Sequence, residues 1–377
     1  MAKYKLGDIV TLLNGRAYLM PELQDSGKYR ILRVGNLSGG NDSWYYSDME
    51  LDENKYCENG DLLYAWACNF GPHIWREEKV IYHYHIWKLV ENKEKVDRTY
   101  LYYYLLHQTP FYLGGVNGAT MVHITKKNME KKTVYIPSSL NVQHRIASIL
   151  STYDSLIENN TKRIRLLEKM AENLYKEWFV RFRFPGHENV EMENGLPKGW
   201  KRGSLSDVCE FKRGKNITSS EMQEGNVPVI SAGLEPSGYH SCSNVKGVNV
   251  TMSSSGANAG YIAIHYSDIW AADCSYIEES TTGNIYYVYE LLNNIRTVIN
   301  NFQRGAAQPH VYPKDVNRIK LILPSKELML KANGRLEIMY KEIYNLQKQN
   351  SLLARQRDLL LPRLMSGKLE VKEELLE

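Results

Sequence analysis

Two long stretches of the chain carry apolar residues at alternating spacings of four and three. The first runs from residue 146 to residue 178, and the second runs from residue 336 to residue 364. Such a heptad pattern is typical of a helix that packs along one narrow stripe against a partner helix. Ser139 and Ser325 lie just before the two stretches, and serine favourably caps the start of a helix. The pattern therefore predicts two helical rods.

The two predicted rods match each other well enough to pair within one chain. Each seam has a polar residue near its middle, Asn160 in the first rod and Asn350 in the second, and Arg357 interrupts the second seam. A buried asparagine weakens a coiled coil but specifies its register. At about 1.5 Å per residue, some forty residues make a rod of roughly 60 Å. We expect an antiparallel intramolecular pair; the alternative is that each rod packs on another protein.

The segment before each rod has a different pattern, with short β-rich runs separated by Gly, Asn and Asp turns. In the first segment the clearest runs are Tyr29–Val34, Asp61–Trp66 and Val80–Val90, and Arg98–His107 is typical of a helix that packs on them. The second segment aligns loosely with the first, although the middle portions differ. Each segment is predicted to fold as a globular α+β domain, which we term a head.

One unit of the sequence occurs twice. GATMVHITKKNMEKKTVYIP, from Gly118 to Pro137, matches GAAQPHVYPKDVNRIKLILP, from Gly305 to Pro324, without a gap. In both places the unit leads directly into a rod. The fold class is therefore predicted to be α+β, a pseudo-twofold tandem repeat with two heads separated by two long antiparallel coiled-coil helices. The predicted parts are residues 1–137 (first head), 138–184 (first rod), 185–200 (polar linker), 201–324 (second head) and 325–377 (second rod and C-terminal tail).

The amino-acid composition excludes some classes of protein but does not indicate an activity. The chain has 47 Lys and Arg against 43 Asp and Glu, and the resulting formal charge of +4 is too small to indicate a nucleic-acid partner. Five scattered cysteines without a Cys-x-x-Cys pair favour neither a disulfide framework nor a structural zinc site. No apolar run is long enough to span a membrane and no signal peptide is evident, so we expect a cytoplasmic protein.

No pattern of catalytic residues stands out. The sequence has no Gly-x-x-x-x-Gly-Lys-Ser/Thr loop for nucleotide phosphates, and Gly256–Gly260 lacks the third glycine of a dinucleotide fingerprint. His83 and His85 alternate along a predicted strand and would share one face of it, but no third metal ligand accompanies them. We therefore predict that the chain is not an enzyme and binds no cofactor or metal of its own.

Basic, aromatic and amide side chains gather in the glycine-bearing loops of both heads. Arg and Lys bind phosphates or the edge of guanine, and Asn and Gln pair with adenine, so two matching sets of loops rich in these types predict a DNA-binding surface. For each residue the alternative is a solvated surface position, and for the two histidines it is a hydrogen bond within the core. The candidate DNA-binding residues are Asn69, His73, Trp75, Arg76, Asn117, Thr120, His123, Lys126 and Lys127 in the first head, and Lys212, Arg213, Lys215, Asn216, Asn258, Tyr261, Arg304, Gln308, His310 and Lys314 in the second.

Two similar but unequal heads on stiff rods suit a target that has two parts. On duplex DNA, which rises about 3.4 Å per base pair, each head would recognise one short half-site and the rods would set the gap between them. The half-sites should differ because the heads differ. A different interpretation is a coiled-coil adaptor whose heads bind proteins and have no affinity for DNA.

The rods also resemble a known family. Residues 136–189 (IPSSLNVQHRIASILSTYDSLIENNTKRIRLLEKMAENLYKEWFVRFRFPGHEN) resemble the central conserved region of the DNA-specificity subunits of type I restriction–modification systems. NGLPKGW before the second head matches the entry to that family's second target-recognition domain, and residues 349–371 (QNSLLARQRDLLLPRLMSGKLEV) resemble its distal conserved region. The resemblance covers essentially the whole chain. One departure is that the second rod has Leu330–Asn333 where the first has Gln143–Ile146.

The resemblance implies a function and a set of partners. The heads would be two target-recognition domains for a bipartite, asymmetric site in duplex DNA, and the rods would be antiparallel spacer helices. Two methyltransferase subunits would bind the chain, optionally with two restriction and translocation subunits. S-adenosylmethionine, ATP and Mg would be bound only by those partner subunits, so this chain would direct their chemistry without catalysing any of it.

Overall fold

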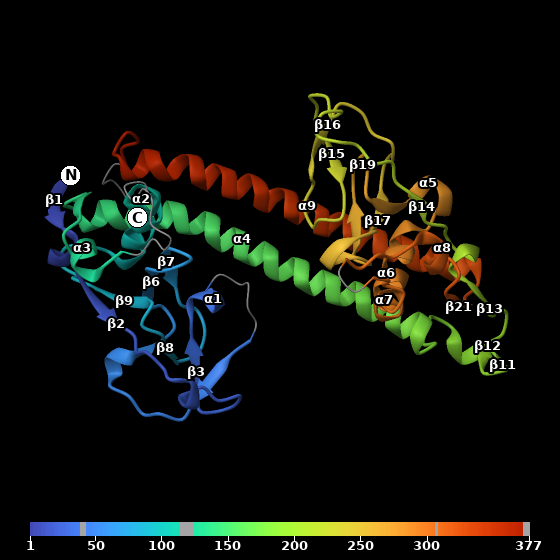
Figure 1. Cartoon of the computed structure of the whole chain (residues 1–377), viewed down its shortest axis with the longest axis horizontal. Helices are drawn as coiled ribbons and strands as arrows, with labels where there is room; N and C mark the ends of the chain where they lie inside the picture. Colours follow the sequence, from blue (N-terminus) through green and yellow to red (C-terminus); the bar gives the residue numbers. More distant parts are fainter. Residues whose placement is uncertain (38–42, 114–123, 306–307, 372–377) are drawn as a thin grey trace. The chain divides into compact units, whose positions relative to one another are not determined.

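The computed structural model describes residues 1–37, 43–113, 124–305 and 308–371 (Figure 1). The chain divides into two compact units, one formed by Met1–Glu158 with Ser351–Glu377 and the other by Asn159–Asn350. Each unit contains one head and part of each long helix. The division falls within both long helices, so the predicted domain boundaries along the sequence stay predictions.

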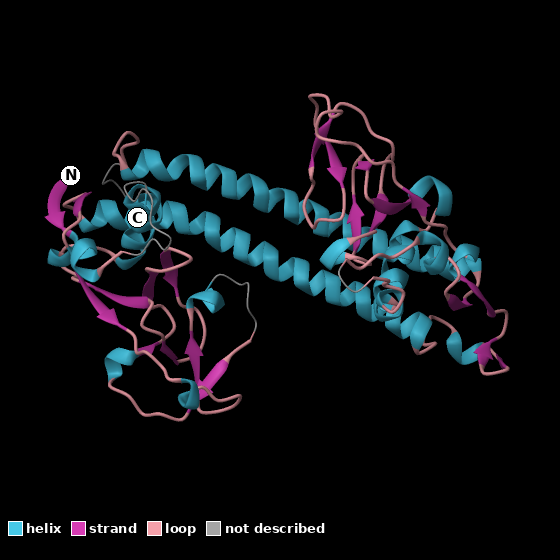
Figure 2. Ribbon diagram, viewed as in Figure 1, coloured by secondary structure: helices cyan, strands magenta, loops and turns pink. Residues whose placement is uncertain are grey.

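The two predicted rods are long helices (Figure 2). α4 runs from Leu140 to Tyr175 and continues as the π-helical turn η4 (Lys176–Val180), and α9 runs from Lys326 to Met365. None of the helices in the described parts of the chain is both long and apolar enough to cross a membrane. Two long helices together with heads that mix strands and helices confirm the predicted α+β fold class.

Both long helices begin with the same serine cap. Ser139 Oγ accepts a hydrogen bond from the Val142 N–H (3.4 Å), and Ser325 Oγ accepts one from the Leu328 N–H (3.3 Å). Each bond satisfies one of the N–H groups that the first turn of a helix leaves without an intrahelical partner. The serines before the two heptad stretches therefore act as the sequence predicted.

The second unit shows how α4 and α9 pack together. Asn160 Nδ2 donates a hydrogen bond to Gln349 Oε1 (3.5 Å), and farther along α4 the Arg163 guanidinium pairs with Glu342 (2.7 Å). Rising residue numbers in α4 thus meet falling numbers in α9, which confirms that the pair is antiparallel. Asn160 is buried in the seam and faces a glutamine, so the polar seam position is matched by another amide.

In the first unit, the seam residue Arg357 has polar partners. Its guanidinium forms an ion pair with Asp154 on α4, and the Tyr103 hydroxyl donates a hydrogen bond to the same carboxylate. A charged residue inside a seam is costly unless it is paired and hydrogen-bonded. The interruption seen in the heptad pattern is therefore a polar junction between both long helices and the first head.

The described part of the first head consists of short strands, three α-helices and short 3-10 turns. Its helices are α1 (Val34–Leu37), α2 (Arg98–Leu113) and α3 (Lys126–Glu130). Its strands are β1 (Ala2–Lys5), β2 (Val10–Asn14), β3 (Tyr29–Leu32), β4 (Tyr45–Ser47), β5 (Tyr56–Cys57), β6 (Leu62–Ala65), β7 (Gly71–Ile74), β8 (Val80–Tyr82), β9 (Ile86–Glu91) and β10 (Thr133–Ile136).

The predicted strand from Val80 to Val90 is wrong, because the chain turns between β8 and β9. His83 and His85 lie in that turn and do not alternate on one strand face. Their rings lie 4.8 Å apart, and burial lowers the pKa of His83 to about 4. Within the described parts of the chain, no three His, Cys, Asp or Glu side chains come close enough together to hold a metal ion.

The second head follows a short hairpin in the predicted linker, formed by β11 (Met192–Glu193) and β12 (Leu196–Pro197). Its helices are α5 (Glu279–Thr282), α6 (Ile285–Asn294), α7 (Arg296–Asn300) and α8 (Pro313–Val316). Its strands are β13 (Lys201–Ser204), β14 (Lys212–Arg213), β15 (Val227–Ile230), β16 (Gly238–His240), β17 (Asn249–Ser253), β18 (Ile262–His265), β19 (Trp270–Ala271), β20 (Cys274–Glu278) and β21 (Lys320–Leu323).

The two heads share one sheet topology. One four-stranded sheet has the order β2-β9-β6-β7 in the first head and β14-β20-β17-β18 in the second. In both heads a second sheet is built on one parallel pair, β3 with β8 and β15 with β19. A separate antiparallel ribbon joins the start of each head to the strand before its rod, β1 with β10 and β13 with β21. The repeat seen in the sequence therefore extends to the sheets of both heads, and the first head adds β5 beside β8.

Gly15 and Gly214 follow β2 and β14 at matching points of the two heads. A Cβ at Gly15 would lie 2.4 Å from the carbonyl oxygens of Tyr82 and His83, and one at Gly214 would lie 2.5 Å from that of Ala272. The following residue in each head then hydrogen-bonds to the parallel-pair strand. Glycine is thus required at both points because another backbone passes too close for a side chain.

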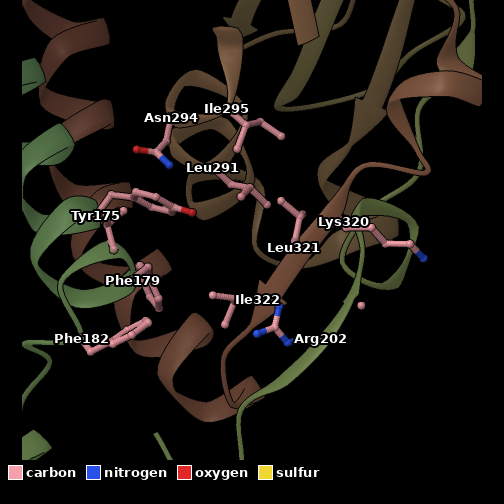
Figure 3. Close-up of a pocket in the computed structure, with 12 residues that line it drawn as sticks. Tyr175, Phe179, Phe182, Arg202, Leu291, Asn294, Ile295, Lys320, Leu321 and Ile322 are labelled. Atoms are coloured by element: carbon pink, nitrogen blue, oxygen red, sulfur yellow. The ribbon is translucent and has the colours of Figure 1, made fainter. Parts of the chain in front are cut away.

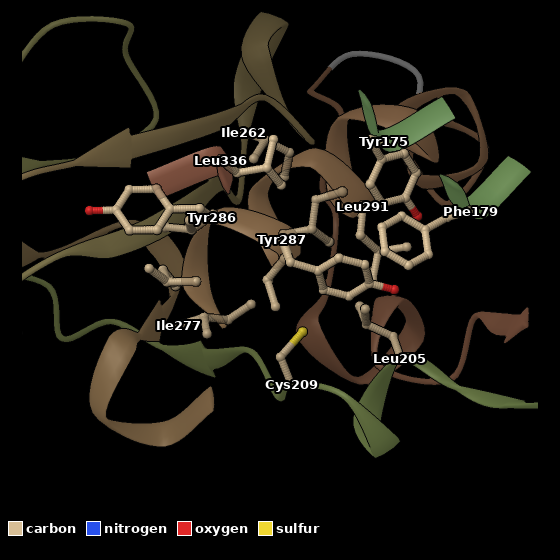
Figure 4. Close-up of a cluster of buried hydrophobic side chains, with 14 of the residues drawn as sticks. Tyr175, Phe179, Leu205, Cys209, Ile262, Ile277, Tyr286, Tyr287, Leu291 and Leu336 are labelled. Carbon is tan, nitrogen blue, oxygen red and sulfur yellow. The ribbon is translucent and has the colours of Figure 1, made fainter. Parts of the chain in front are cut away.

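The main core of each unit joins its head to its long helices. In the second unit, Tyr175 and Phe179 from α4 and η4 pack on Tyr287 from α6 (Figure 4). Leu336 from α9 joins the same cluster. In the first unit the corresponding cluster gathers residues of β2, β9, α2, α4 and α9. The head helices α2 and α6 therefore act as the attachment points to the rods.

Candidate nucleic-acid interface

A groove of about 510 Å³ opens on the second head beside β14. Three exposed cationic side chains line it: Arg213 from β14, Lys314 from α8, and Arg318 just after α8. The ring of Tyr312, which is 42% exposed, lines the same groove, and Glu210 contributes a carboxylate. Cations bind phosphates and an exposed aromatic ring stacks on bases, so this combination suits a nucleic-acid strand.

Local hydrogen bonds hold the walls of this groove together. Pro313 is the first residue of α8, and its fixed φ favours the start of a helix directly after Tyr312. At the end of α8, Asn317 Oδ1 accepts a hydrogen bond from the Phe211 N–H (3.0 Å), and Asn317 Nδ2 donates one to the Phe211 carbonyl (3.2 Å). The segment that leads into β14 is therefore tied to the segment that carries the cations of the opposite wall.

Four candidate residues of the second head lie in one connected group. Arg304 and His310 exchange backbone hydrogen bonds of 2.9 and 2.8 Å, and His310 also pairs with Ser255 through a backbone bridge. Ser255 Oγ donates to Asp273, whose carboxylate lies 4.0 Å from the Arg213 guanidinium. Lys314 lies on the adjoining helix α8. The structure thus brings together Arg213, Arg304, His310 and Lys314.

The other candidates of the second head lie away from the groove lining. Asn258 Nδ2 donates to the Ala232 carbonyl (3.4 Å), and the Arg296 guanidinium stacks over the Tyr261 ring at 5.2 Å. These two candidates thus already contact other residues of the head. The remaining candidates are exposed: Lys212, Lys215, Asn216 and Gln308.

In the first head, two candidates are covered by the protein. Trp75 is only 6% exposed, and its indole N–H donates to the Glu78 carbonyl (2.8 Å). His73 lies on β7, and burial lowers its pKa. A neutral histidine and a buried indole cannot supply positive charge to a phosphate. Their place as DNA contacts stays a prediction, and the geometry gives both a role in packing.

The remaining described candidates of the first head are more open. Asn69 and Arg76 are exposed, and the Arg76 guanidinium lies 3.8 Å from the Glu158 carboxylate. Lys127 is exposed on α3, next to Lys126, whose ammonium lies 3.7 Å from the carboxylate of Glu130. Asn117, Thr120 and His123 lie outside the described residues.

Sequence reasoning missed two groove residues, Tyr312 and Arg318. Both belong to the repeated unit, where Tyr312 aligns with Thr125 and Arg318 aligns with Lys131. Thr125 Oγ1 accepts a hydrogen bond from the Asn128 N–H (3.3 Å) and caps α3, so the first head has no ring at this position. Tyr312 could have been identified from the sequence because it is aromatic at a position where the first unit has Thr125, a residue type that caps helices.

Comparison of the sequence with known families gives one consistent match. The profile described as the type I restriction modification DNA specificity domain matches residues 1–169 and 197–352. The chain is similar to the specificity subunit of the type I restriction enzyme MjaIX of Methanocaldococcus jannaschii, with 27% identity over 307 residues, covering 74% of this chain and 71% of that protein. The MjaVIII specificity subunit of the same organism is 26% identical over 230 residues, covering 60% of this chain and 53% of that protein.

A solved structure shares the fold. The S subunit of a type I restriction–modification system from M. genitalium superposes with a TM-score of 0.68 at 20% sequence identity, covering 96% of this chain and 95% of that chain. The similarity extends over both heads and both long helices, and it agrees with the fold class predicted from the heptad stretches and the repeated unit.

Proposed function

The chain belongs to the family of type I restriction–modification DNA-specificity proteins, and from that premise we propose that it recognises a bipartite, asymmetric site in duplex DNA. Specificity subunits are the non-catalytic DNA-recognition components of restriction–modification systems. In the proposed function each head recognises one half-site, and the chain directs methyltransferase subunits, and restriction subunits where they are present, to the DNA.

The main support for this function is that both heads have matching sheets but expose different side chains at matching positions. One four-stranded sheet has the same strand order in both heads. At the groove, the second head has Arg213 and Tyr312, whereas the matching positions of the first head are Asn14 and Thr125. A shared backbone presents different groups to a ligand in each head, which supports recognition of two different base sequences.

Exposed apolar residues on the long helices support the docking of partner subunits. Three on each helix recur at intervals of seven residues or a multiple of seven, so these follow one stripe. Exposed stripes of this kind are typical binding faces for helices of another protein. The stripe consists of Ile149, Leu156 and Met170 on α4, and of Ile338, Leu352 and Leu359 on α9, while Leu166 and Leu330 are exposed at other spacings.

The proposal assigns no cofactor to this chain. S-adenosylmethionine, ATP and Mg belong to the partner subunits, and the part played here is DNA recognition. The proposed DNA contacts are the candidate residues predicted from the sequence, with Tyr312 and Arg318 added because they line the groove with Arg213 and Lys314.

Sequencing the methylated adenines of a host that expresses this chain with its methyltransferase tests the proposal. We expect one motif with two unequal half-sites separated by unspecified bases. Replacement of residues 201–324 by the corresponding head of a relative should change one half-site and leave the other unchanged. A continuous motif, or a change in both half-sites, would contradict the proposal.

The adaptor interpretation predicts a different result. DNA binding through phosphates weakens with salt by roughly 0.9 log units of affinity per log unit of salt for each phosphate contacted. A protein adaptor would show no duplex affinity in the same titration and no methylation motif. Binding measured with the chain and its methyltransferase together therefore separates the two functions.

A further inference from the structure

The ribbon formed by β13 and β21 in the second head has two unlike faces. Ile322 pairs with Arg202, and Lys320 pairs with Ser204, so these four side chains lie on one face. The alternate residue Leu323 is buried on the other face. Ile322 is 39% exposed on the outer face. The solvated face of an antiparallel ribbon normally carries polar side chains, so an exposed isoleucine there is unusual.

The ribbon formed by β1 and β10 in the first head has the same arrangement. Tyr135 pairs with Lys3, and both are exposed on the outer face, where the Tyr135 ring is 52% exposed. Val134 and Ile136 on the inner face are fully buried. Each ribbon therefore shows a large apolar side chain directly opposite a cation on its outer face.

The two outer faces match position by position. Tyr135 and Ile322 occupy the same place in the repeated unit of the sequence. The strands that carry the two cations lead into the same capped turn: the Lys5 N–H donates to Asp8 (3.0 Å), and the Ser204 N–H donates to Asp207 (2.7 Å). One apolar and cationic pair thus recurs at equivalent points of both repeats.

A cleft of about 620 Å³ adjoins the outer face in the second head (Figure 3). Aromatic side chains from α4 and the segment after it, including Phe179 and Phe182, line the cleft, and Ile322 points into it from β21. Arg202 and Lys320 lie on the ribbon side of the same cleft. An apolar side chain of a bound partner could enter this cleft while an acidic residue next to it pairs with Arg202 or Lys320.

The two matching cations are not neutralised by the chain in the parts that the structure describes. Neither Lys3 nor Arg202 lies within ion-pair distance of a carboxylate there. Lys320 does contribute to lowering the pKa of Asp207, after the hydrogen bonds from Ser204. Each outer face therefore presents an exposed positive charge beside an exposed apolar group.

We propose that the outer faces of these two ribbons are docking sites for two copies of one partner, one on each face. The occupant is a segment that carries Asp or Glu beside a large apolar side chain, contributed by each of the two methyltransferase subunits. This inference rests on the proposed function, which includes those subunits. Duplex DNA would fit less well, because its phosphates could meet the cations but nothing in its backbone would fill an apolar cleft.

Matched double substitutions test the two faces separately. One variant carries Lys3→Glu with Tyr135→Ser, the other carries Arg202→Glu with Ile322→Ser, and each is co-expressed with the methyltransferase. Native mass spectrometry of the purified complex should show two methyltransferase copies for the wild type, one copy for either variant, and none for the combination. The affinity for the second copy should fall about 30-fold or more, as for interface residues that contribute strongly to binding.

Three kinds of control keep the test decisive. Lys246→Glu alone changes the net charge as much as either double variant, Lys198→Glu with Lys246→Glu matches the combination of the two, and both controls lie at exposed positions and should retain two copies. Arg202→Lys with Ile322→Val should also retain two copies, and unfolding curves show whether the charged variants are folded. Deletion of residues 372–377, whose sequence KEELLE is itself acidic and apolar, should leave the stoichiometry unchanged.

Other outcomes would overturn the proposed docking sites and leave the proposed recognition of DNA valid. Folded double variants that still bind two methyltransferase copies would exclude the ribbons as docking sites. Tighter binding after deletion of residues 372–377 would assign the first ribbon to the chain's own end, and loss of duplex affinity with intact stoichiometry would assign the faces to DNA. If the wild-type chain binds no methyltransferase at all, the proposed function itself fails.

Discussion

Glu290 is a carboxylate buried where the second head meets its long helices. It is 4% exposed, and the Tyr340 hydroxyl donates a hydrogen bond to it. Burial raises its pKa to about 7, and Glu172 and Glu168 nearby add to that rise while Lys176 opposes it. The folded state therefore holds a proton on Glu290 over a pH range in which the unfolded chain has released it.

Replacement of Glu290 by Gln is expected to remove a pH dependence from the stability of the second unit. Between about pH 4.5 and pH 7 the unfolded state binds fewer protons at this group than the folded state, so the wild-type protein loses stability as pH rises. The loss amounts to about 3 kcal/mol, from the shift in pKa. Urea unfolding at pH 5 and pH 8 should show this difference for the wild type and a smaller one for Glu290→Gln.

A matched substitution distinguishes burial from loss of charge. Glu235→Gln removes one carboxylate from an exposed loop of the same head and should leave the pH dependence as it is in the wild type. A Glu290→Gln variant that lost stability equally at both pH values would show that Glu290 is ionised in the folded state, which would contradict the expected protonation.

The groove of the second head makes a prediction about salt. Lys314→Ala with Arg318→Ala removes two exposed cations that have no carboxylate within ion-pair distance in the described residues. If each contacts one phosphate, the slope of log affinity against log salt should fall by about 1.8. The control Lys198→Ala with Lys246→Ala lowers the net charge equally and should change the slope much less. Equal slopes for both variants would remove the groove from the DNA-binding surface.

At the scale of elements, a buried amide from each rod holds the start of a head helix. Gln143 Oε1 accepts a hydrogen bond from the Asp97 N–H (2.8 Å) just before α2. Asn333 Oδ1 accepts from the N–H groups of Tyr286 (3.0 Å) and Tyr287 (3.2 Å) in the first turn of α6. The first N–H groups of a helix lack intrahelical partners, so Asn333 acts as a cap for α6, whereas Gln143 holds the residue that precedes α2.

Asn333→Leu should destabilise the second unit by about 2–4 kcal/mol, because it leaves two buried N–H donors without a partner. Asn345→Leu, an exposed change in the same helix, should have little effect. Urea unfolding of both variants measures the difference. A small loss at Asn333 would mean that water or a shift of α6 satisfies the two donors.

The same pair of amides shows where prediction from the sequence stops. The heptad stretches and serine caps identified both rods, because one-sided apolar spacing and helix capping are local properties. The ungapped match of the repeated unit, however, aligned Gln143 with Leu330 and suggested that the second rod lacks its equivalent. Asn333 performs the same task one helical turn later, and only the packing of α6 on α9 reveals it.

The candidate site was predicted less well than the fold. Arg213, Arg304, His310 and Lys314 were predicted from residue type and do lie together, because the repeated unit carries two of them and Arg304 directly precedes it. Trp75 has an aromatic side chain of the kind that stacks on bases, but it lies in a buried apolar cluster of the first head. Side-chain type indicates what a residue can bind, whereas burial depends on contacts between distant segments that a single sequence does not show.

At the scale of the whole molecule, the separation of the half-sites is the property that the long helices should control. Inserting seven residues into α4 and seven into α9 adds one heptad to each helix and preserves the seam. The added length of about 10 Å corresponds to about three base pairs of duplex. Methylome sequencing should therefore show a gap wider by about three base pairs, with both half-sites unchanged.

Insertion of four residues into each helix provides the comparison, since four residues disturb the heptad register and locally unwind a coiled coil. That variant should lose methylation or show a motif with no regular gap, while each head still folds on its own sheets. Should the seven-residue variant keep the original gap, something other than the paired helices would have to separate the half-sites. Should its half-sites change as well, recognition could not be divided between two independent heads.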